Sequence, residues 1–338
     1  MMQDEFSLIK QWTRESKDWP RSKNVSVGIG DDAAVFSVSN QREVVACCDA
    51  MIETVHFLKQ TMKPSDIGYK SVISNISDIA AMGGIPLYAL VTIGISPNWS
   101  ASECQEIYEG IYDALREYHV QLIGGDTVST PDALHLSVTL LGEVERGKAF
   151  LRSKANPGDI VFVTGTLGDS AAGLHLLLAE AEKGDPSDDK WKDLRRKHQR
   201  PSAQVTTGRL LHQLEPMGAL NDISDGLASE LWEIAEASHV SILIEEDEIP
   251  LSQTLLDYCR SIDKDPYEWA WTGGEDYQLV GTVPESEYQQ LKELCVDHNL
   301  FITCIGRVQK HDQQFVRMID RYGRERVVEK TGYNHFAT

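Results

Sequence analysis

The chain has 338 residues, of which 41% are hydrophobic and 25% charged, and its formal net charge is −20. This composition is typical of a globular protein of about two domains, and an acidic chain without a basic cluster is not expected to bind nucleic acid. No run approaches the ~18 apolar residues of a membrane span, and Met1–Lys10 lacks the apolar stretch of a secretory signal. The six cysteines have no zinc-binding spacing, so we expect free thiols, no membrane association and a cytoplasmic location.

The first half of the chain alternates predicted strands and helices. Pro64 suits the first turn of a helix and Gly83-Gly84 its end, while Ser100 and Glu103 have the spacing of a capping box. The predicted elements are a strand over Glu43–Asp49, a helix over Pro64–Met82, a strand over Leu87–Ile95, a helix over Ser100–His119 and a strand over Leu134–Val144.

The second half follows a predicted linker over Glu145–Gly158 and has the same alternation. It is expected to contain a strand over Asp159–Thr164, a helix over Asp169–Lys183, a loop over Gly184–Asp189, helices near 202–214, 226–238 and 285–298, and strands near 240–245, 276–283 and 301–308. Such alternation predicts a mixed or parallel sheet covered by helices. We therefore expect an α/β (α+β) fold with two αβ domains, over 1–150 and 151–338.

The most informative feature is a set of acidic residues at the ends of elements, several of them beside glycine. The set consists of Gly30-Asp31-Asp32, Cys48-Asp49, Gly125-Asp126, Asp222-Ile223-Ser224-Asp225-Gly226 and Gly274-Glu275-Asp276. A single Gly-Asp pair is most often a turn. Carboxylates at strand ends can instead converge on Mg²⁺, which prefers oxygen ligands, and they repel one another unless metal ions lie between them. Composition alone leaves turns and a metal site about equally open.

The predicted helix over Pro64–Met82 carries a polar stripe of Ser71, Asn75 and Asp78, which share one helix face. The stripe either faces water or supplies Asp78 to a metal site.

Common phosphate-binding and hydrolytic signatures are missing from the sequence. There is no G-x-x-x-x-G-K-[ST], no H-R-D or D-F-G set and no G-x-S-x-G. The segment Gly165–Ser170 opens a predicted helix, a place where anions can bind. Because Asp169 would oppose an anion there, we favour Asp169 as the N-cap of that helix.

Five motifs and the tail, taken together and in this order, resemble the thiamine-monophosphate kinase family. They are Gly28-Ile29-Gly30-Asp31-Asp32-Ala33-Ala34, Asn75-Ile76-Ser77-Asp78-Ile79-Ala80-Ala81-Met82-Gly83, Leu122-Ile123-Gly124-Gly125-Asp126-Thr127, Asp222-Ile223-Ser224-Asp225-Gly226-Leu227, Gly273-Gly274-Glu275-Asp276-Tyr277 and Gly332-Tyr333-Asn334-His335-Phe336. The resemblance covers essentially the whole chain. Its wider superfamily includes aminoimidazole ribonucleotide synthetase, selenophosphate synthetase and a hydrogenase maturation protein.

The resemblance implies a homodimer in which the N-terminal sheet pairs with its copy to form a barrel. It implies ATP as co-substrate on the N-terminal domain, Mg²⁺ in the cleft between the domains, and direct in-line phosphoryl transfer to thiamine monophosphate. The implied metal ligands are Asp32, Asp49, Asp78, Asp126, Asp222 and Asp225; Gly125, Asp126, Arg152 and Ser224 would contact the nucleotide, with Asp126 and Arg152 catalytic, and His56, Glu275 and Tyr333 would contact thiamine monophosphate.

One position departs from the family pattern, which has a small hydroxyl pair where this chain has Cys47-Cys48. Thiols are poor ligands for Mg²⁺, so neither cysteine is expected to hold a metal through its side chain. Three other functions remain open: an aminoimidazole ribonucleotide synthetase-like enzyme, a non-catalytic protein that binds nucleotide and metal, and a metal-dependent phosphatase. Turnover with a panel of acceptors separates these functions.

Overall fold

The computed structural model describes residues 25–27, 31–32, 34–37, 40–183, 189–214, 218–333 and 335. The predicted features in Met1–Lys10, Gly28–Gly30 and residues 184–188, and the tail positions Asn334 and Phe336, lie outside the described residues. Within the described part, no helix is both long and apolar enough to cross a bilayer, and the six cysteines form no disulfide.

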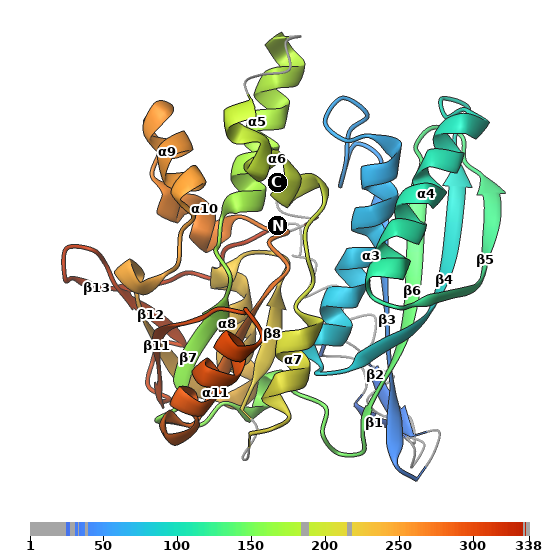
Figure 1. Cartoon of the computed structure of the whole chain (residues 1–338). Coiled ribbons are helices and arrows are strands. Elements are labelled where there is room, and N and C mark those ends of the chain that lie inside the picture. Colours follow the sequence, from blue (N-terminus) through green and yellow to red (C-terminus); the bar gives the residue numbers. More distant parts are fainter. Residues whose placement is uncertain are drawn as a thin grey trace.

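The N-terminal part has a mixed sheet with two long helices on one of its faces (Figure 1). Its elements are β1 (Val25–Val27), β2 (Ala34–Ser37), β3 (Arg42–Ile52), α3 (Pro64–Ala81), β4 (Ile85–Ile95), α4 (Ala101–Glu117), β5 (Gln121–Ser129) and β6 (His135–Glu145). In the described residues the strand order is β1-β2-β3-β6-β4-β5. Only the β4–β5 pair among these is parallel, because α4 returns the chain from the end of β4 to the start of β5.

The predicted helix signals are confirmed in this part. Pro64 occupies the first turn of α3, and Ser100 and Glu103 form a reciprocal capping box at the start of α4. Strands β4 and β6 alternate between buried residues and half-buried ones. The buried side chains pack against α3 and α4, and among the described residues no helix covers the opposite face of the sheet.

The C-terminal part has a second sheet with helices on both faces. Its elements are η1 (Arg152–Lys154), β7 (Ile160–Thr164), α5 (Asp169–Lys183), η2 (Asp189–Trp191), α6 (Lys192–Gln199), α7 (Val205–Leu211), β8 (Leu220–Ile223), α8 (Leu227–Ser238), β9 (Val240–Glu245), η3 (Glu246–Glu248), α9 (Gln253–Ser261), α10 (Pro266–Thr272), β10 (Gln278–Val283), α11 (Glu285–Asp297), β11 (Ile302–Lys310), β12 (Val316–Ile319) and β13 (Glu325–Val327). Among described strands the order is β13-β12-β9-β11-β7-β10-β8, and only β12 pairs with its neighbour β9 in parallel.

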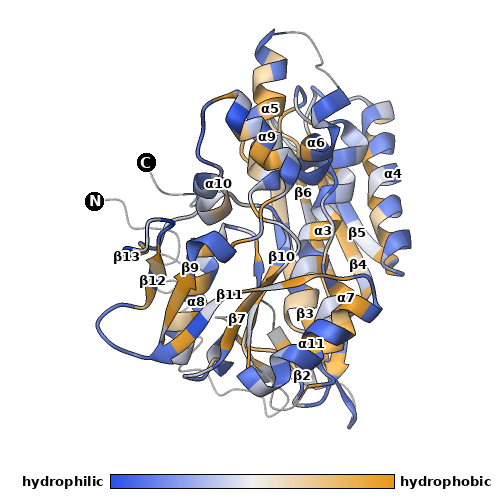
Figure 2. Cartoon of the chain, turned by 60° about the vertical axis from the view of Figure 1, so that its left-hand side comes forward, coloured by the Kyte–Doolittle hydropathy of each residue, from blue (hydrophilic) through white to orange (hydrophobic). Residues whose placement is uncertain are grey.

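Strands β7, β9 and β10 of this second sheet are largely hydrophobic (Figure 2). Along β7, Val161 and Val163 pack in the core under α8, whereas Ile160 and Phe162 pack in the core under α7 and α11. A strand that is buried on both faces reads as a continuous apolar run, which is why its sequence predicts it well.

Helix α3 lies between the two sheets (Figure 1) and contacts β3, β4 and β6 on one side and α7 and β8 on the other. All its residues from Asp66 to Ser77 are buried. Of the predicted polar stripe, Ser71 and Asn75 are therefore buried rather than in water, and Asp78 is partly exposed. The part of α3 that carries Asp78 thus borders the space between the two sheets.

The predicted N-cap role of Asp169 is wrong. Its carboxylate accepts hydrogen bonds from the hydroxyls of Thr166 (2.6 Å) and Ser252 (2.5 Å). The amides of Gly168 and Ser170 at the start of α5 donate instead to the carboxylate of Asp276, at 2.6 and 3.1 Å. The anion-binding end of α5 is therefore filled by a side chain from elsewhere in the chain, and burial raises the pKa of Asp276 to about 7.

Candidate active site

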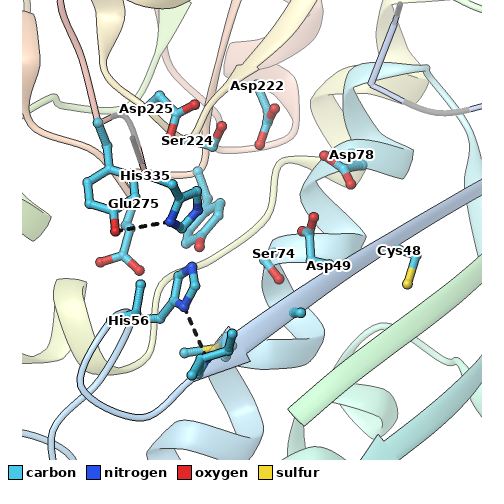
Figure 3. A pocket seen from close by; sticks show the side chains of 16 residues that line it. Cys48, Asp49, His56, Ser74, Asp78, Asp222, Ser224, Asp225, Glu275 and His335 are labelled. Atoms are coloured by element: carbon cyan, nitrogen blue, oxygen red, sulfur yellow. Dashed lines mark hydrogen bonds between the residues drawn. The ribbon is translucent and has the colours of Figure 1, made fainter. Parts of the chain in front are cut away.

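A cavity of about 690 Å³ lies beside α3, between the two sheets. It is lined by side chains from β3 and the turn after it, from α3, and from the segments that follow β8 and α10 (Figure 3). Eight of the predicted site residues line it: Asp49, His56, Asp78, Asp222, Ser224, Asp225, Glu275 and Tyr333. Residues from both halves of the chain therefore meet in one cleft.

One end of this cleft is acidic. Carboxylate oxygens of Asp32, Asp78 and Asp222 lie within 4.8 Å of one another, and the Ser77 hydroxyl donates to Asp222 at 2.7 Å. Burial and the neighbouring carboxylates raise the pKa values of Asp32 and Asp78 well above their usual range, and burial raises the pKa of Asp222 to about 6. Such mutual repulsion is relieved either by protons or by cations.

The acidic end fits a hard divalent cation. Asp32 Oδ2 is buried and has no hydrogen-bond partner in the described part of the chain, which is unusual for a carboxylate oxygen. Asp49 lines the same end; its backbone amide donates to Asn75 Oδ1 at 3.1 Å, and burial raises the pKa of its carboxyl group. A cluster of oxygen ligands with an unsatisfied buried member matches what Mg²⁺ requires.

Arg152 lies behind the acidic end, on η1. Its guanidinium pairs with Asp32 and, at 3.1 Å, with Glu233, and it donates to Asn221 Oδ1 at 3.0 Å. Burial lowers the pKa of Arg152, but Asp32 and Glu233 outweigh it and the net shift is upward. Arg152 is therefore a permanent cation fixed against one oxygen of Asp32, and it is not among the residues that line the cavity.

The other end of the cleft is built around Glu275. Its Oε2 lies 2.7 Å from Nζ of Lys70, which is fully buried, and 3.5 Å from Nδ1 of His198, which is also buried. Burial raises the pKa of Glu275, but Lys70 and His198 more than offset this and hold it below its usual value. Glu275 is thus ionised and neutralised by a partner beneath the surface of the cleft.

His56 presents a hydrogen-bond donor to the same end. The backbone amide of Ile52 donates to His56 Nδ1 at 3.0 Å, so in the neutral ring Nε2 carries the proton. Burial and the nearby His335, whose ring centroid is 5.0 Å away, lower the pKa of His56. The Tyr333 hydroxyl lies 3.3 Å from His335 Nδ1 (Figure 3). The rings of His56, Tyr333 and His335 line the same end of the cleft as Glu275 and can enclose a planar ligand.

Gly125 and Asp126 lie away from this cleft within one chain. The expectation that Gly125-Asp126 lies at the end of an element is wrong, because β5 continues to Ser129. Strands β6 and β4 lie between β5 and β3. The distance from β5 to β3 is therefore three strand spacings, or roughly 14 Å at ~4.8 Å each. A Cβ on Gly125 would lie 1.9 Å from Val91 O, so glycine is required there for strand pairing. A separate hollow of about 540 Å³ includes Gly125, Asp126 and Tyr108.

Several residues of the site were not predicted from the sequence. They are Lys70, Ser74, Tyr108, His198, Tyr277 and His335. Lys70 offered one signal, since it is a lysine in the middle of a helix with isoleucine at Ile67, Ile73 and Ile76. A lysine at such a position either extends to water or pairs in the interior, and the sequence does not show which carboxylate is available.

Comparisons with known proteins match the chain over nearly its whole length. Two family profiles match, the AIR synthase related protein N-terminal domain over residues 30–144 and its C-terminal domain over residues 156–319. The thiamine-monophosphate kinase of Bacillus subtilis is 46% identical over 98% of this chain and 99% of its own length. The corresponding kinase of Haemophilus influenzae is 36% identical over 99% of each chain.

Solved structures give the same result. A complex described as AaThiL with AMPPCP and TMP is 34% identical, superposes with a TM-score of 0.85 and covers 99% of each chain. The thiamine monophosphate kinase of Aquifex aeolicus has a TM-score of 0.79 at 32% identity, over 96% of this chain and 99% of its own. Hydrogenase maturation proteins at 20–21% identity share the fold.

Proposed function

The chain belongs to the thiamine-monophosphate kinase family of AIR synthase related proteins, and we propose on this premise that it transfers the γ-phosphoryl group of ATP to thiamine monophosphate, forming thiamine diphosphate. The observation that carries the proposal is the difference in charge between the two ends of the cleft. Clustered carboxylates lie at one end and a neutralised glutamate with aromatic neighbours at the other. A relative of this fold is described as binding AMPPCP and TMP together.

The metal ligands are proposed to be Asp32, Asp49, Asp78, Asp222 and Asp225, with Asp126 as described below. Mg²⁺ held there would neutralise phosphate charge and let two anions approach each other. Phosphoryl transfer requires positioning and charge stabilisation more than covalent help, so we propose direct in-line transfer without a phosphoenzyme.

The protein side chains orient the two substrates. Arg152, fixed by Asp32 and Glu233, would place a positive charge beside the nucleotide phosphates, and Ser224 would contact the nucleotide from the segment after β8. His56 would donate its Nε2–H to the acceptor phosphate, which carries no proton of its own to share. Glu275 and Tyr333 would bind the heterocycles of thiamine monophosphate at the far end.

A second copy of the chain is proposed to complete the site. In the described part of the chain no helix covers the face of the N-terminal sheet opposite α3 and α4, and β5 exposes Ile123 (50%) and Val128 (46%) at the edge of that sheet. A sheet with an uncovered face and exposed apolar side chains along its edge strand is expected to pair or be covered. Pairing of two such sheets into a barrel would bring Asp126 of the partner subunit to the acidic end, which the same chain's Asp126 does not reach.

The test is turnover by the purified protein with ATP, Mg²⁺ and thiamine monophosphate, with thiamine diphosphate followed by chromatography. Product is expected with the wild-type protein and is expected to be lost with EDTA and with Asp126→Asn. Mixed dimers of Asp126→Asn and Asp78→Asn chains would regain one intact site if the two residues act across the interface. ATP binding without product would favour a synthetase-like acceptor or a non-catalytic protein, and phosphate release without ATP would favour a phosphatase.

A further inference from the structure

We propose that Lys70 is a positioning residue of the acceptor site. Lys70 binds one oxygen of Glu275, and the other oxygen is thereby presented as a charge-neutralised hydrogen-bond acceptor for an amino group on the substrate's heterocycle. The inference rests on the proposed function for the identity of the substrate. It assigns to Glu275 the recognition of a hydrogen-bond donor, rather than of the positive charge of a thiazolium ring.

The first observation is the burial of Lys70. Its side chain has no exposed surface, and in the described part of the chain Glu275 is its only acidic partner within 4.0 Å, at 2.7 Å. A buried ammonium is costly unless it is paired. The pair spans the two parts of the chain, since Lys70 belongs to α3 and Glu275 follows α10, so the position of Glu275 is tied to the N-terminal sheet.

The second observation is the backbone of Glu275. Its φ is +66°, a left-handed conformation that residues with a side chain adopt only where their surroundings hold them. Its amide donates to the carbonyl of Ser224 at 2.7 Å. Backbone and side chain are therefore fixed independently, and both direct the carboxylate into a small cavity of about 240 Å³ that opens from the cleft.

The third observation is the charge balance around the carboxylate. His198 Nδ1 lies 3.5 Å from the same Oε2 and 3.2 Å from the Ser170 hydroxyl. Burial and Lys70 lower the pKa of His198 to about 3, so this ring is neutral. One anion and one cation remain, and the pair has no net charge to offer a cationic ligand.

The walls of the small cavity indicate what the free oxygen recognises. Val55, Ala171 and Leu174 form apolar surface and Tyr277 adds a ring. An aromatic heterocycle that carries an exocyclic amino group matches such a cavity, because its rings replace water on the walls and its N–H bonds to the oxygen. A site built around one such hydrogen bond discriminates strongly against an analogue that lacks the donor.

The experiment compares thiamine monophosphate with oxythiamine monophosphate, in which a carbonyl oxygen replaces the pyrimidine amino group. Wild type, Lys70→Met, Glu275→Gln and the double variant are assayed, and binding of both ligands is measured by calorimetry. Lys59→Met is the matched control, because Lys59 pairs with Glu103 at 2.8 Å outside the cleft. The wild type is expected to prefer the amino substrate at least ~100-fold in kcat/KM.

The proposal expects Lys70→Met to raise KM for thiamine monophosphate ~10-fold or more, with kcat within about threefold, and to reduce the preference for the amino substrate about tenfold. Lys59→Met is expected to behave as wild type. In the Glu275→Gln background, Lys70→Met is expected to add nothing, since the residue acts through Glu275.

Unchanged KM and preference in Lys70→Met would overturn the proposal, as would an equal additional loss in the Glu275→Gln background. If Lys70→Met alone does not fold, the double variant, which has neither charge, is compared with Glu275→Gln: equal KM supports the proposal and a further tenfold rise refutes it. If the wild type turns over neither substrate, the proposed function fails, and the calorimetric preference still decides the role of Lys70.

Discussion

The two ends of the cleft treat acidic side chains in opposite ways. At one end, Asp32, Asp78 and Asp222 lie together with raised pKa values, and among the described residues Arg152 is the one cation paired with them. At the other end, Glu275 has its own buried lysine and a lowered pKa. A buried lysine therefore accompanies the carboxylate that acts as a permanent hydrogen-bond acceptor, whereas the clustered carboxylates at the acidic end need a cation from outside the chain.

The difference teaches how to separate a binding role from a structural one. Carboxylates that repel each other destabilise the folded chain and are expected to be kept only for what they bind. Removing the lysine from a carboxylate–lysine pair in the interior is costly, because it leaves a buried charge without a partner. Substitutions at the two ends should therefore move stability in opposite directions while both reduce activity.

The largest expected effect is on turnover, at the acidic end. Asp78→Asn is expected to lower kcat about 1,000-fold, because metal-assisted charge stabilisation supplies several kcal/mol. Without Mg²⁺ the same variant is expected to melt at a higher temperature than the wild type, since a repelling charge is gone. Steady-state kinetics and thermal melts in EDTA measure both, with Asp257→Asn, a partly exposed aspartate outside the cleft, as control. A lower melting temperature without metal would contradict the comparison.

The next effect is on stability, at the Glu275 end. Lys70→Met leaves Glu275 without its partner and is expected to cost about 3 kcal/mol of unfolding free energy, the lower part of the range for a broken buried pair, because the Glu275 side chain is 28% exposed. Urea unfolding measures the loss. The double variant with Glu275→Gln is expected to recover most of it, and failure to recover would show that Lys70 stabilises the fold through other contacts.

The acidic end also predicts a pH dependence for the metal-free protein. The folded pKa of Asp222, about 6, lies above its ordinary value of 3.8, so its contribution to stability is fully present below pH 3.8 and is lost as the pH rises through 6. The unfolding free energy in EDTA is expected to fall by about 2–3 kcal/mol over this range. Saturating Mg²⁺ should flatten the dependence, and an equally steep loss with Mg²⁺ present would argue against a metal at this end.

The smallest effect is expected where the two parts of the chain meet outside the cleft. Arg209 on α7 binds both carboxylate oxygens of Glu145 on β6 at 2.8 Å and donates to Gly83 O at 2.7 Å. Arg209 lowers the pKa of Glu145 to about 2, so this contribution is present above the ordinary value of 4.5 and is lost as the pH falls towards 2. Because the pair is partly exposed, Arg209→Met is expected to cost only about 1 kcal/mol, measured by urea unfolding at pH 7. A loss as large as that of Lys70→Met would show that ion pairs inside and outside the cleft contribute equally to the unfolding free energy.

The sequence predicts best the parts whose signals are local. The start of α3 at Pro64 and the capping box at Ser100 depend on neighbours within a turn, and both are confirmed. Asp32 and Asp222 belong to the predicted set of acidic residues at the ends of elements, and Asp78 belongs to the predicted polar stripe of its helix. The predicted end of β5 at Asp126 fails because Gly125 permits a close approach to β4, a relation between distant residues.

The parts that could not be predicted depend on long-range pairing. Lys70 and His198 carry no local signal of what they contact, since Glu275 is 205 and 77 residues away in the chain. The capping of α5 by Asp276 is of the same kind. Short elements such as α10 and β13 also lie below the length at which periodicity identifies a helix or a strand.

Helix α3 carries Lys70 near its middle and Asp78 near its end, so one helix reaches both ends of the cleft. Eight residues of helix correspond to about 12 Å of rise, and this length does not change when the two sheets move relative to each other. The distance from the heterocycle of an acceptor to its phosphate must therefore match the fixed length of a helix rather than a gap that a hinge can adjust. Acceptors with a longer or shorter spacer between ring and phosphate would be rejected by length alone, even where both of their ends bind well.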